Sequence, residues 1–389
     1  MDKGNNTDTK RKMKILHLGN FKSGIDMYVR NSVALAGDDF EFVIVGGADD
    51  NSLPFKHKGK EVKTYSISMF RALSPKKDIK ALIQAVKIIK KEKPDLVHCH
   101  SAKGGVIGRI AARLTGTKSV YTAHAFSFLS SESRKKAKIY LLLEKIARMK
   151  STLLACSESE RKLGVDVVGY KEDRALVWSN AVPDSKPQVA ESLNPAEDIH
   201  IPAPGEKYIV TIGRPSYQKN PLFMVDVAKG IHKKYPEIKF YLLGAGFYSP
   251  MLDEMKSLIH EYGLDDVFYI LPWLCHAETL RFVEGSMLYF STSLYEGLPI
   301  AVIEAMSLGK AVIASNVLGN KDCIKDGYNG MLLPLDDGIF VDKMCELIEK
   351  ESLREEMGSN SRKYFESDFL IDNRIKALED IYRNIISSK

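Results

Sequence analysis

Cysteine is scarce in this sequence, and the few cysteines are scattered. Of the 389 residues, five are cysteine, at positions 99, 156, 275, 323 and 345. No two of them have the close spacing of paired metal ligands, and their number is odd. This pattern argues against a disulfide framework and against a cysteine-based zinc site. It is typical of reduced thiols in a cytoplasmic protein.

Long hydrophobic runs are absent as well. No apolar stretch approaches the roughly 20 residues that a membrane-spanning helix needs. The N-terminus, MDKGNNTDTKRKMK, is basic and polar throughout, so it is not a signal peptide. We expect residues 1–12 to form a disordered leader. The remaining chain is long enough for two domains, each with its own core.

Acidic residues are few in the N-terminal half. Residues 1–200 contain 35 Lys and Arg against 23 Asp and Glu, a balance of +12, whereas residues 201–389 contain 21 against 27, a balance of −6. The overall net charge of +6 hides this asymmetry. We therefore expect the two halves to bind different partners, and the basic half suits an anionic one.

Short apolar runs alternate with helical stretches along most of the chain. This order predicts an α/β protein with parallel, doubly wound sheets, whose ligands bind in a cleft at the carboxyl ends of the strands. A Pro-rich, polar stretch at 183–206 marks a domain boundary. The predicted units are an N-terminal domain at 13–185, a linker at 186–206, a C-terminal domain at 207–365 and a C-terminal helix at 366–389. Strands are expected at 14–18, 40–47, 95–99, 118–124, 208–213, 238–246, 267–271, 287–293 and 310–315.

Two predicted helices carry an apolar face. The first, which begins near residue 79, places Ile79, Leu82, Ile83, Val86 and Ile89 together. The second, within 131–150, has an apolar arc of Ile139, Leu142, Leu143, Ile146 and Met149 beside Arg134, Lys138, Lys145 and Arg148. This basic amphipathic segment has two interpretations. It can lie on an anionic membrane surface, or it can be a domain helix whose apolar arc packs on the sheet.

The segment YEGLPIAVIEAM places one carboxylate before a helix and another within it. Pro299 suits the first helical turn, and Gly297 allows a close approach of the backbone to a ligand. The free amides at this helix start can bind phosphate, while Glu296 and Glu304 can accept hydrogen bonds from hydroxyl groups on either side. The pattern fits a nucleotide-sugar, but a capped helix with one exposed glutamate and one surface ion pair explains the spacing equally well.

Two cations favour the nucleotide-sugar. The stretch IGRPSYQKN leaves a predicted strand, so Arg214 and Lys219 lie on a loop at the carboxyl edge of the sheet. There they can neutralise a diphosphate leaving group without a metal. The alternative is two solvated surface charges. LGAGF, with Gly244 and Gly246, supplies another glycine-rich turn after a strand.

The set GRPSYQKN, LLGAG, STSLYEGLPIAVIEAMSLGKAVIAS and GYNGMLLP resembles the C-terminal domain of the retaining glycosyltransferases of family 4, which have the GT-B fold. The resemblance is close over 208–335 and looser in the N-terminal half. It implies two Rossmann-like domains that face each other across a cleft, the first for the acceptor and the second for a nucleotide-sugar. It also implies that the last helix crosses back to the N-terminal domain.

The same resemblance assigns roles to the residues of the C-terminal half. Glu296 would hold hydroxyl groups of the donor sugar and Glu304 the ribose, while the amides around Gly297 and Leu298 would hold phosphate. Arg214 and Lys219 match the two cations that bind the diphosphate in this family. Gly244 and Gly246 would line the donor site, and the turn at 271–274 would lie near the base.

In the N-terminal half, YTAHAFSF places His124 at the family's active-site histidine, although a core histidine is the alternative. His98 and His100 share a strand face, but no third ligand is evident, so no metal is expected. Two motifs depart from the family. The first strand–helix turn has separated glycines rather than paired ones, and Asn180-Ala181 replaces an Asn-Gly turn, which leaves no expected contact there.

The implied activity is a retaining, metal-independent hexosyltransferase without a protein nucleophile or a cofactor. It would move a hexose or N-acetylhexosamine from a nucleotide-sugar, with UDP inferred from the family alone, to a polyprenyl-diphosphate-linked glycan. Such an enzyme would act in bacterial O-antigen, capsule or exopolysaccharide synthesis, in the cytoplasm or on the inner face of the membrane. Two alternatives stay open, a nucleotide-sugar epimerase of the same fold and a non-catalytic nucleotide-sugar or glycan-binding protein. An oxidoreductase is disfavoured, because no strand leads into a full GxGxxG turn.

Overall fold

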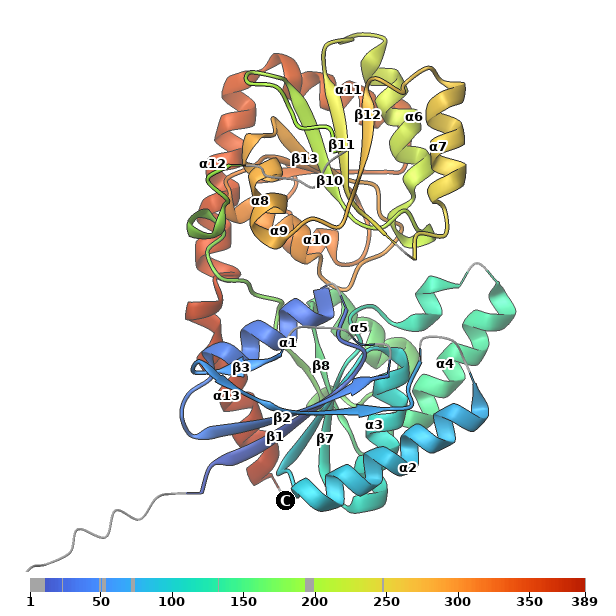
Figure 1. The fold of residues 1–389 in the computed structure, drawn as a ribbon, viewed down its shortest axis with the longest axis vertical. Helices are drawn as coiled ribbons and strands as arrows, with labels where there is room; N and C mark the ends of the chain where they lie inside the picture. Colours follow the sequence, from blue (N-terminus) through green and yellow to red (C-terminus); the bar gives the residue numbers. More distant parts are fainter. Residues whose placement is uncertain are drawn as a thin grey trace, which may run out of the picture.

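The chain forms two α/β domains, one above the other in Figure 1. The computed structural model describes residues 11–388 except 23, 49, 51–53, 71–73, 132, 193–198 and 247. The expected leader therefore lies outside the described residues as far as residue 10, and the first strand begins at Met13. Part of the expected linker, residues 193–198, also lies outside them.

The N-terminal domain is built on a seven-stranded sheet in the order β5-β2-β1-β6-β7-β8-β9, in which every pairing is parallel. Its strand order reverses between β1 and β6, where ligands of such sheets bind. The strands are β1 (Met13–Leu18), β2 (Phe40–Gly47), β5 (Lys63–Ile67), β6 (Leu96–His100), β7 (Lys118–Thr122), β8 (Thr152–Ala155) and β9 (Ala175–Val177). A short antiparallel pair, β3 (Lys56–His57) and β4 (Lys60–Glu61), stands apart.

Helices cover both faces of this sheet. One face packs on α1 (Gly24–Leu35) and on the C-terminal helix α13 (Ile371–Ser387), and the other on α2 (Pro75–Glu92) and α3 (Ala102–Thr115). The helix α4 (Arg134–Arg148) lies against α3, and α5 (Glu158–Leu163) follows β8. Short helical turns are η1 (Ser127–Ser130), η2 (Gly164–Val168), η3 (Glu172–Arg174), η4 (Lys186–Gln188) and η5 (Tyr217–Lys219).

The C-terminal domain repeats this plan with six parallel strands in the order β12-β11-β10-β13-β14-β15. The strands are β10 (Tyr208–Ile212), β11 (Lys239–Ala245), β12 (Phe268–Pro272), β13 (Leu288–Ser291), β14 (Val312–Ser315) and β15 (Gly330–Leu333). The helices are α6 (Pro221–His232), α7 (Leu252–Glu261), α8 (His276–Gly285), α9 (Ile300–Ser307), α10 (Asn320–Cys323), α11 (Asp337–Glu349) and α12 (Glu351–Asp368). The predicted doubly wound α/β class is thus confirmed.

The last two helices join the domains. Figure 1 shows α12 beside the C-terminal domain and α13 beside the N-terminal one. Leu378 and Tyr382 of α13 are buried in the core of the N-terminal domain. At the crossing, Val182 N donates to Phe369 O at 3.0 Å and Ile371 N donates to Val182 O at 3.1 Å. The chain therefore returns to the N-terminal domain at its end.

The predicted apolar face of α2 is confirmed for Leu82, Val86 and Ile89, which pack on the core of the domain. It is wrong for the other two residues. Ile79 and Ile83 are 60% and 51% exposed, whereas the buried side includes Ala81, Ala85 and Ile89. Two alanines one turn apart allow α2 to lie close to α3, with which it shares a long contact. The larger isoleucines consequently remain outside.

Of the two interpretations of the α4 arc, packing on the sheet is wrong. Ile139, Leu142, Leu143, Ile146 and Met149 are 55%, 57%, 37%, 55% and 43% exposed. The side of α4 that faces the domain carries Glu144 and Ala147 instead. Glu144 Oε2 accepts from Arg109 Nη2 at 2.7 Å and Glu144 Oε1 accepts from Tyr121 Oη at 2.9 Å, all within the protein interior. A buried ion pair therefore attaches α4, and its apolar arc faces outward.

Candidate donor and acceptor site

The carboxylate of Glu296 lies in a polar network at the carboxyl end of the second sheet. It is 8% exposed, and its Oε1 accepts hydrogen bonds from Lys219 Nζ at 2.6 Å and Ser293 Oγ at 2.7 Å. Its Oε2 accepts from Gln218 Nε2 at 3.0 Å. Because β10 and β13 are neighbours, the loops that follow them meet. The predicted sugar-binding carboxylate and one predicted diphosphate-binding cation are therefore direct partners, and Gln218 and Ser293 join them.

Arg214 lies on the loop after β10 and extends toward the loop after β11. Its Nη1 donates to Tyr248 O at 3.4 Å, and its guanidinium carbon is 5.7 Å from the centre of the Tyr248 ring. Gly244, with φ of 105°, lies against the first loop, since a Cβ on it would be 3.8 Å from the Gly213 backbone. The left-handed conformation at Gly244 is one that glycine adopts without strain. The two glycine-containing turns are thus adjacent.

The turn expected near the base contains an exposed aromatic ring. Trp273 is 55% exposed, and a Cβ on Gly246 would lie 2.3 Å from its indole. Glycine at position 246 therefore gives the indole room to lie on the backbone after β11. Sequence reasoning placed this turn but did not single out Trp273.

Glu304 has a partner that sequence reasoning missed. It is 6% exposed, on α9, and its Oε1 lies 2.7 Å from His276 Nε2 at the start of α8. The hydrogen bond to Glu304 raises the pKa of His276 above its ordinary value of 6.5. Pro299, predicted in the first helical turn, instead immediately precedes α9 with φ of −75°. Val302 N and Ile303 N donate to Pro299 O at 3.1 and 3.2 Å, so the amides of Ile300 and Ala301 are the ones at this helix start that can bind an anion.

His124 lies where the two domains touch. A Cβ on Gly297 would be 2.7 Å from Ala125 N and 3.0 Å from His124 C. The imidazole points into its own domain, with Nε2 3.1 Å from His100 Nδ1 and Nδ1 3.5 Å from Cys156 Sγ. Burial lowers its pKa to about 3, so the ring is neutral near pH 7. The atoms nearest to this Cβ belong to the backbone of His124 and Ala125. The residues around Gly297, from Glu296 to Leu298, are called the glycine loop below.

His98 and His100 do have a third histidine beside them, which corrects the expectation from sequence. His17 pairs with His98 across β1 and β6, and the three imidazoles bring ligand atoms within 4.8 Å of one another. Their nitrogens are already largely bonded, His98 to Tyr382 Oη and Thr122 Oγ1, and His100 to His17 and His124. A metal bound through all three would break some of these bonds. Among the described atoms of the cluster, His17 Nε2 is the ring nitrogen without a partner.

Further contacts across the domain boundary hold the glycine loop. Ser157 Oγ donates to Gly297 O at 2.8 Å, and Asn180 Nδ2 donates to Leu298 O at 2.7 Å. No contact was expected for Asn180, because Asn180-Ala181 replaces the Asn-Gly turn of the family. The side chain nevertheless reaches across. Both carbonyls flanking the predicted phosphate-binding amides are thus fixed by the N-terminal domain.

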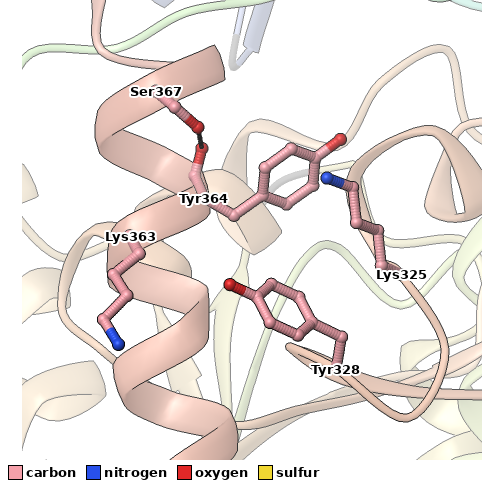
Figure 2. Close-up of a pocket in the computed structure, with 5 residues that line it drawn as sticks. All are labelled: Lys325, Tyr328, Lys363, Tyr364 and Ser367. Atoms are coloured by element: carbon pink, nitrogen blue, oxygen red, sulfur yellow. Dashed lines mark hydrogen bonds between the residues drawn. The ribbon is translucent and has the colours of Figure 1, made fainter.

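A cavity of about 380 Å³ lies elsewhere, between α12 and the loop that precedes β15. Figure 2 shows its lining, with the amine of Lys325 beside the ring of Tyr364, 3.8 Å from the ring centre. The lining residues are Lys325, Tyr328, Lys363, Tyr364 and Ser367. None of the predicted donor residues contributes to it, so it is separate from the site at Glu296.

Comparison with known protein families assigns the chain to a family of glycosyltransferases. Residues 23–186 match the family described as Glycosyltransferase Family 4, and residues 196–364 match that described as Glycosyl transferases group 1. The chain belongs to the family 4 glycosyltransferases, and its two facing Rossmann-like domains are the GT-B fold. The prediction of a glycosyltransferase is therefore confirmed and is favoured over the epimerase and the non-catalytic alternative.

Individual relatives are similar over most of their length. The chain is 30% identical to the UDP-Gal:alpha-D-GlcNAc-diphosphoundecaprenol alpha-1,3-galactosyltransferase of Escherichia coli, over 83% of this chain and 84% of that protein. It is 27% identical to the capsular polysaccharide biosynthesis glycosyltransferase CapM of Staphylococcus aureus, over 97% and 98%. The structure of Anabaena HepE with UDP and glucose superposes with a TM-score of 0.76 at 19% identity, over 96% of this chain and all of that one.

Proposed function

We propose that this glycosyltransferase is retaining and metal-independent, and that it transfers a hexose or N-acetylhexosamine from a UDP-sugar to a polyprenyl-diphosphate-linked glycan. The observation that carries the proposal is the network of Glu296, Lys219, Gln218 and Ser293 beside the start of α9. It holds a carboxylate and a cation at one point, where the hydroxyls of a sugar and the charge of a diphosphate meet. The E. coli relative, by its name, uses UDP-Gal and a diphosphoundecaprenol-linked acceptor.

The chemistry requires stabilisation of the leaving diphosphate. The ammonium of Lys219 has three donors, so it can keep its bond to Glu296 and still bind a phosphate oxygen. Arg214 and the first amides of α9 add further positive potential. The acceptor hydroxyl attacks the anomeric carbon as the bond to the diphosphate breaks. An oxygen of the leaving phosphate takes the hydroxyl proton, so no side chain serves as nucleophile.

Donor binding is tested first by the thermal stability of the protein with UDP, GDP and ADP and with their sugars. A ligand far above its dissociation constant stabilises a protein by about 3–4 kcal/mol. We expect UDP compounds to raise the melting temperature of the wild type and of Lys256→Ala, an exposed control on α7, but to act much less on Arg214→Ala. No shift with any nucleotide would contradict the donor site.

Transfer is tested with a lipid-linked saccharide acceptor. We expect Glu296→Gln to lower kcat strongly with little change in fold, because the carboxylate orients the sugar in the transition state. The anomeric configuration of the product, read by NMR, decides retention, and activity after treatment with EDTA decides the metal requirement. Conversion of the UDP-sugar without any acceptor would instead indicate an epimerase.

The exposed surface of α4 bears on where the enzyme meets a lipid-linked acceptor. No helix in the described part of the chain is long and apolar enough to cross a bilayer. The outward arc of α4 lies beside six basic residues of the same helix, and its single carboxylate, Glu144, is buried against Arg109. Apolar side chains flanked by cations bind anionic lipid surfaces. We propose that α4 lies on the inner face of the cytoplasmic membrane, near lipid-linked acceptors.

Vesicle binding tests this placement. Leu142→Ser with Ile146→Ser should reduce cosedimentation with phosphatidylglycerol vesicles several-fold, and the wild type should bind phosphatidylcholine vesicles weakly. The matched control is Leu335→Ser with Ile339→Ser, two apolar residues that are each 39% exposed in the other domain. Equal binding of both double variants would contradict the role of α4.

A further inference from the structure

Helix α5, which follows β8, contains a buried carboxylate that the donor site does not use. Glu160 is 4% exposed, and its Oε1 accepts from Ala125 N at 2.7 Å while its Oε2 accepts from Cys156 N at 2.7 Å. Across the part of the chain that the structure describes, no lysine or arginine forms an ion pair with it. Burial of an unpaired carboxylate is unfavourable, so two short bonds to backbone amides are its main stabilisation.

One of these amides belongs to a strained turn. His124 and Ala125 have φ of 53° and 76°, the left-handed region that residues other than glycine rarely adopt. Consecutive residues of this kind persist only where the surroundings hold them. The bond from Ala125 N to Glu160 is such a restraint, because it fixes the amide in the middle of the turn.

The His124–Ala125 turn is in direct contact with the C-terminal domain. Gly297 lies so close to it that a Cβ would meet Ala125 N at 2.7 Å. Ser157, which accepts from Glu160 N at 3.1 Å at the start of α5, donates its hydroxyl to Gly297 O at 2.8 Å. Residues 156–160 thus hold the acceptor-side turn through Glu160 and the donor-side loop through Ser157.

We propose that Glu160 is a positioning residue for the transfer, which holds the His124–Ala125 turn in the shape that Gly297 contacts. Both of its oxygens are bonded to backbone amides, so it acts through the turn and not on substrate. Resting on the proposed function, this inference names the residue that sets the spacing between the acceptor side and the donor side. A loss of that spacing lowers turnover more than donor binding, because the donor residues lie in the other domain.

Glu160→Gln is the direct test. An amide supplies one acceptor where two are needed, and its own N–H groups would face a backbone N–H. We expect kcat to fall about tenfold or more, as for the loss of one well-placed bond, with the dissociation constant for UDP within twofold of wild type. Glu158→Gln, on the exposed side of α5, is the matched control and should retain wild-type kcat. Wild-type turnover in Glu160→Gln would overturn the inference.

Glycine at position 125 separates a positioning role from a general structural one. Because glycine adopts the left-handed conformation without strain, Ala125→Gly should restore most of the kcat that Glu160→Gln loses. A purely structural role predicts no rescue, and that result would overturn the inference even if the single variant folds poorly.

Amide hydrogen exchange measures the stability of the turn and needs no saccharide acceptor. The amides of residues 122–127 should exchange about tenfold faster in Glu160→Gln than in wild type, since the Ala125 amide loses its partner. Unchanged exchange would refute the inference. Absence of transfer by the wild type, with the expected exchange, would refute the proposed function alone.

Discussion

Gly297→Ala places a methyl group at the contact between the two domains. The new Cβ would lie 2.7 Å from Ala125 N and 3.0 Å from His124 C, both backbone atoms that cannot rotate away. Gly297 itself does not have a left-handed conformation, so alanine suits its backbone. The substitution therefore acts on the approach of the domains and not on the local fold.

The size of the effect follows from the displacement. Ordinary contact begins at 3.4 Å, so the methyl group must move from 2.7 Å by about 0.7 Å. Misplacement of reacting groups by about 1 Å can cost roughly a hundredfold in rate. We expect kcat to fall about 10- to 100-fold, which corresponds to about 1.4–2.7 kcal/mol of transition-state energy. The domains can separate slightly, so the melting temperature should change little.

The assay is steady-state transfer to a lipid-linked acceptor, with UDP binding measured in parallel. Gly338→Ala is the control, because its Cβ would meet only the Asp336 carboxylate, at 3.3 Å, far from the domain contact. The dissociation constant for UDP should stay near wild type in both variants. A kcat for Gly297→Ala within twofold of wild type would show that the reacting state does not need this contact.

Two further predictions concern ion pairs. Arg362 forms a bidentate pair with Asp184, with one hydrogen bond to each carboxylate oxygen. This pair lowers the pKa of the Asp184 carboxyl from its usual 3.8 to about 2. Its contribution to stability is therefore fully present above pH 3.8 and is lost as the pH falls through about 2. Asp184→Asn should cost about 1–2 kcal/mol at pH 7, discounted for partial exposure, and urea unfolding should show the difference shrinking near pH 2. The raised pKa of His276 means that its bond to Glu304 stabilises fully below pH 6.5 and less as the pH rises through the raised value. The melting temperature of wild type minus that of Glu304→Gln should fall from pH 6 to pH 9, and a constant difference would refute this.

Much of the fold could be predicted from local pattern. The eight-residue strand β2 was predicted with the same bounds, 40–47. Its nearly continuous apolar run is typical of a parallel strand that is buried on both faces of the sheet. The strands β5, β8, β9 and β15 were missed, although β13 and β14, which have four residues each, were predicted. Of the site, the loop positions of Arg214, Lys219 and Glu296 could be predicted, because parallel strands direct their carboxyl ends to one edge.

The sequence by itself determined most of the segments that become strands and helices, and which charged residues follow the strands of the second sheet. Only the tertiary structure decided what those residues touch. It paired Lys219 with Glu296, brought His17 to His98, and set Gly297 against the turn at His124. It also turned the apolar arc of α4 outward. Periodicity shows that a helix has an apolar and a polar face, but it does not show which face packs on the domain. In α4 the side with Glu144 packs inward, because Glu144 forms a buried ion pair with Arg109.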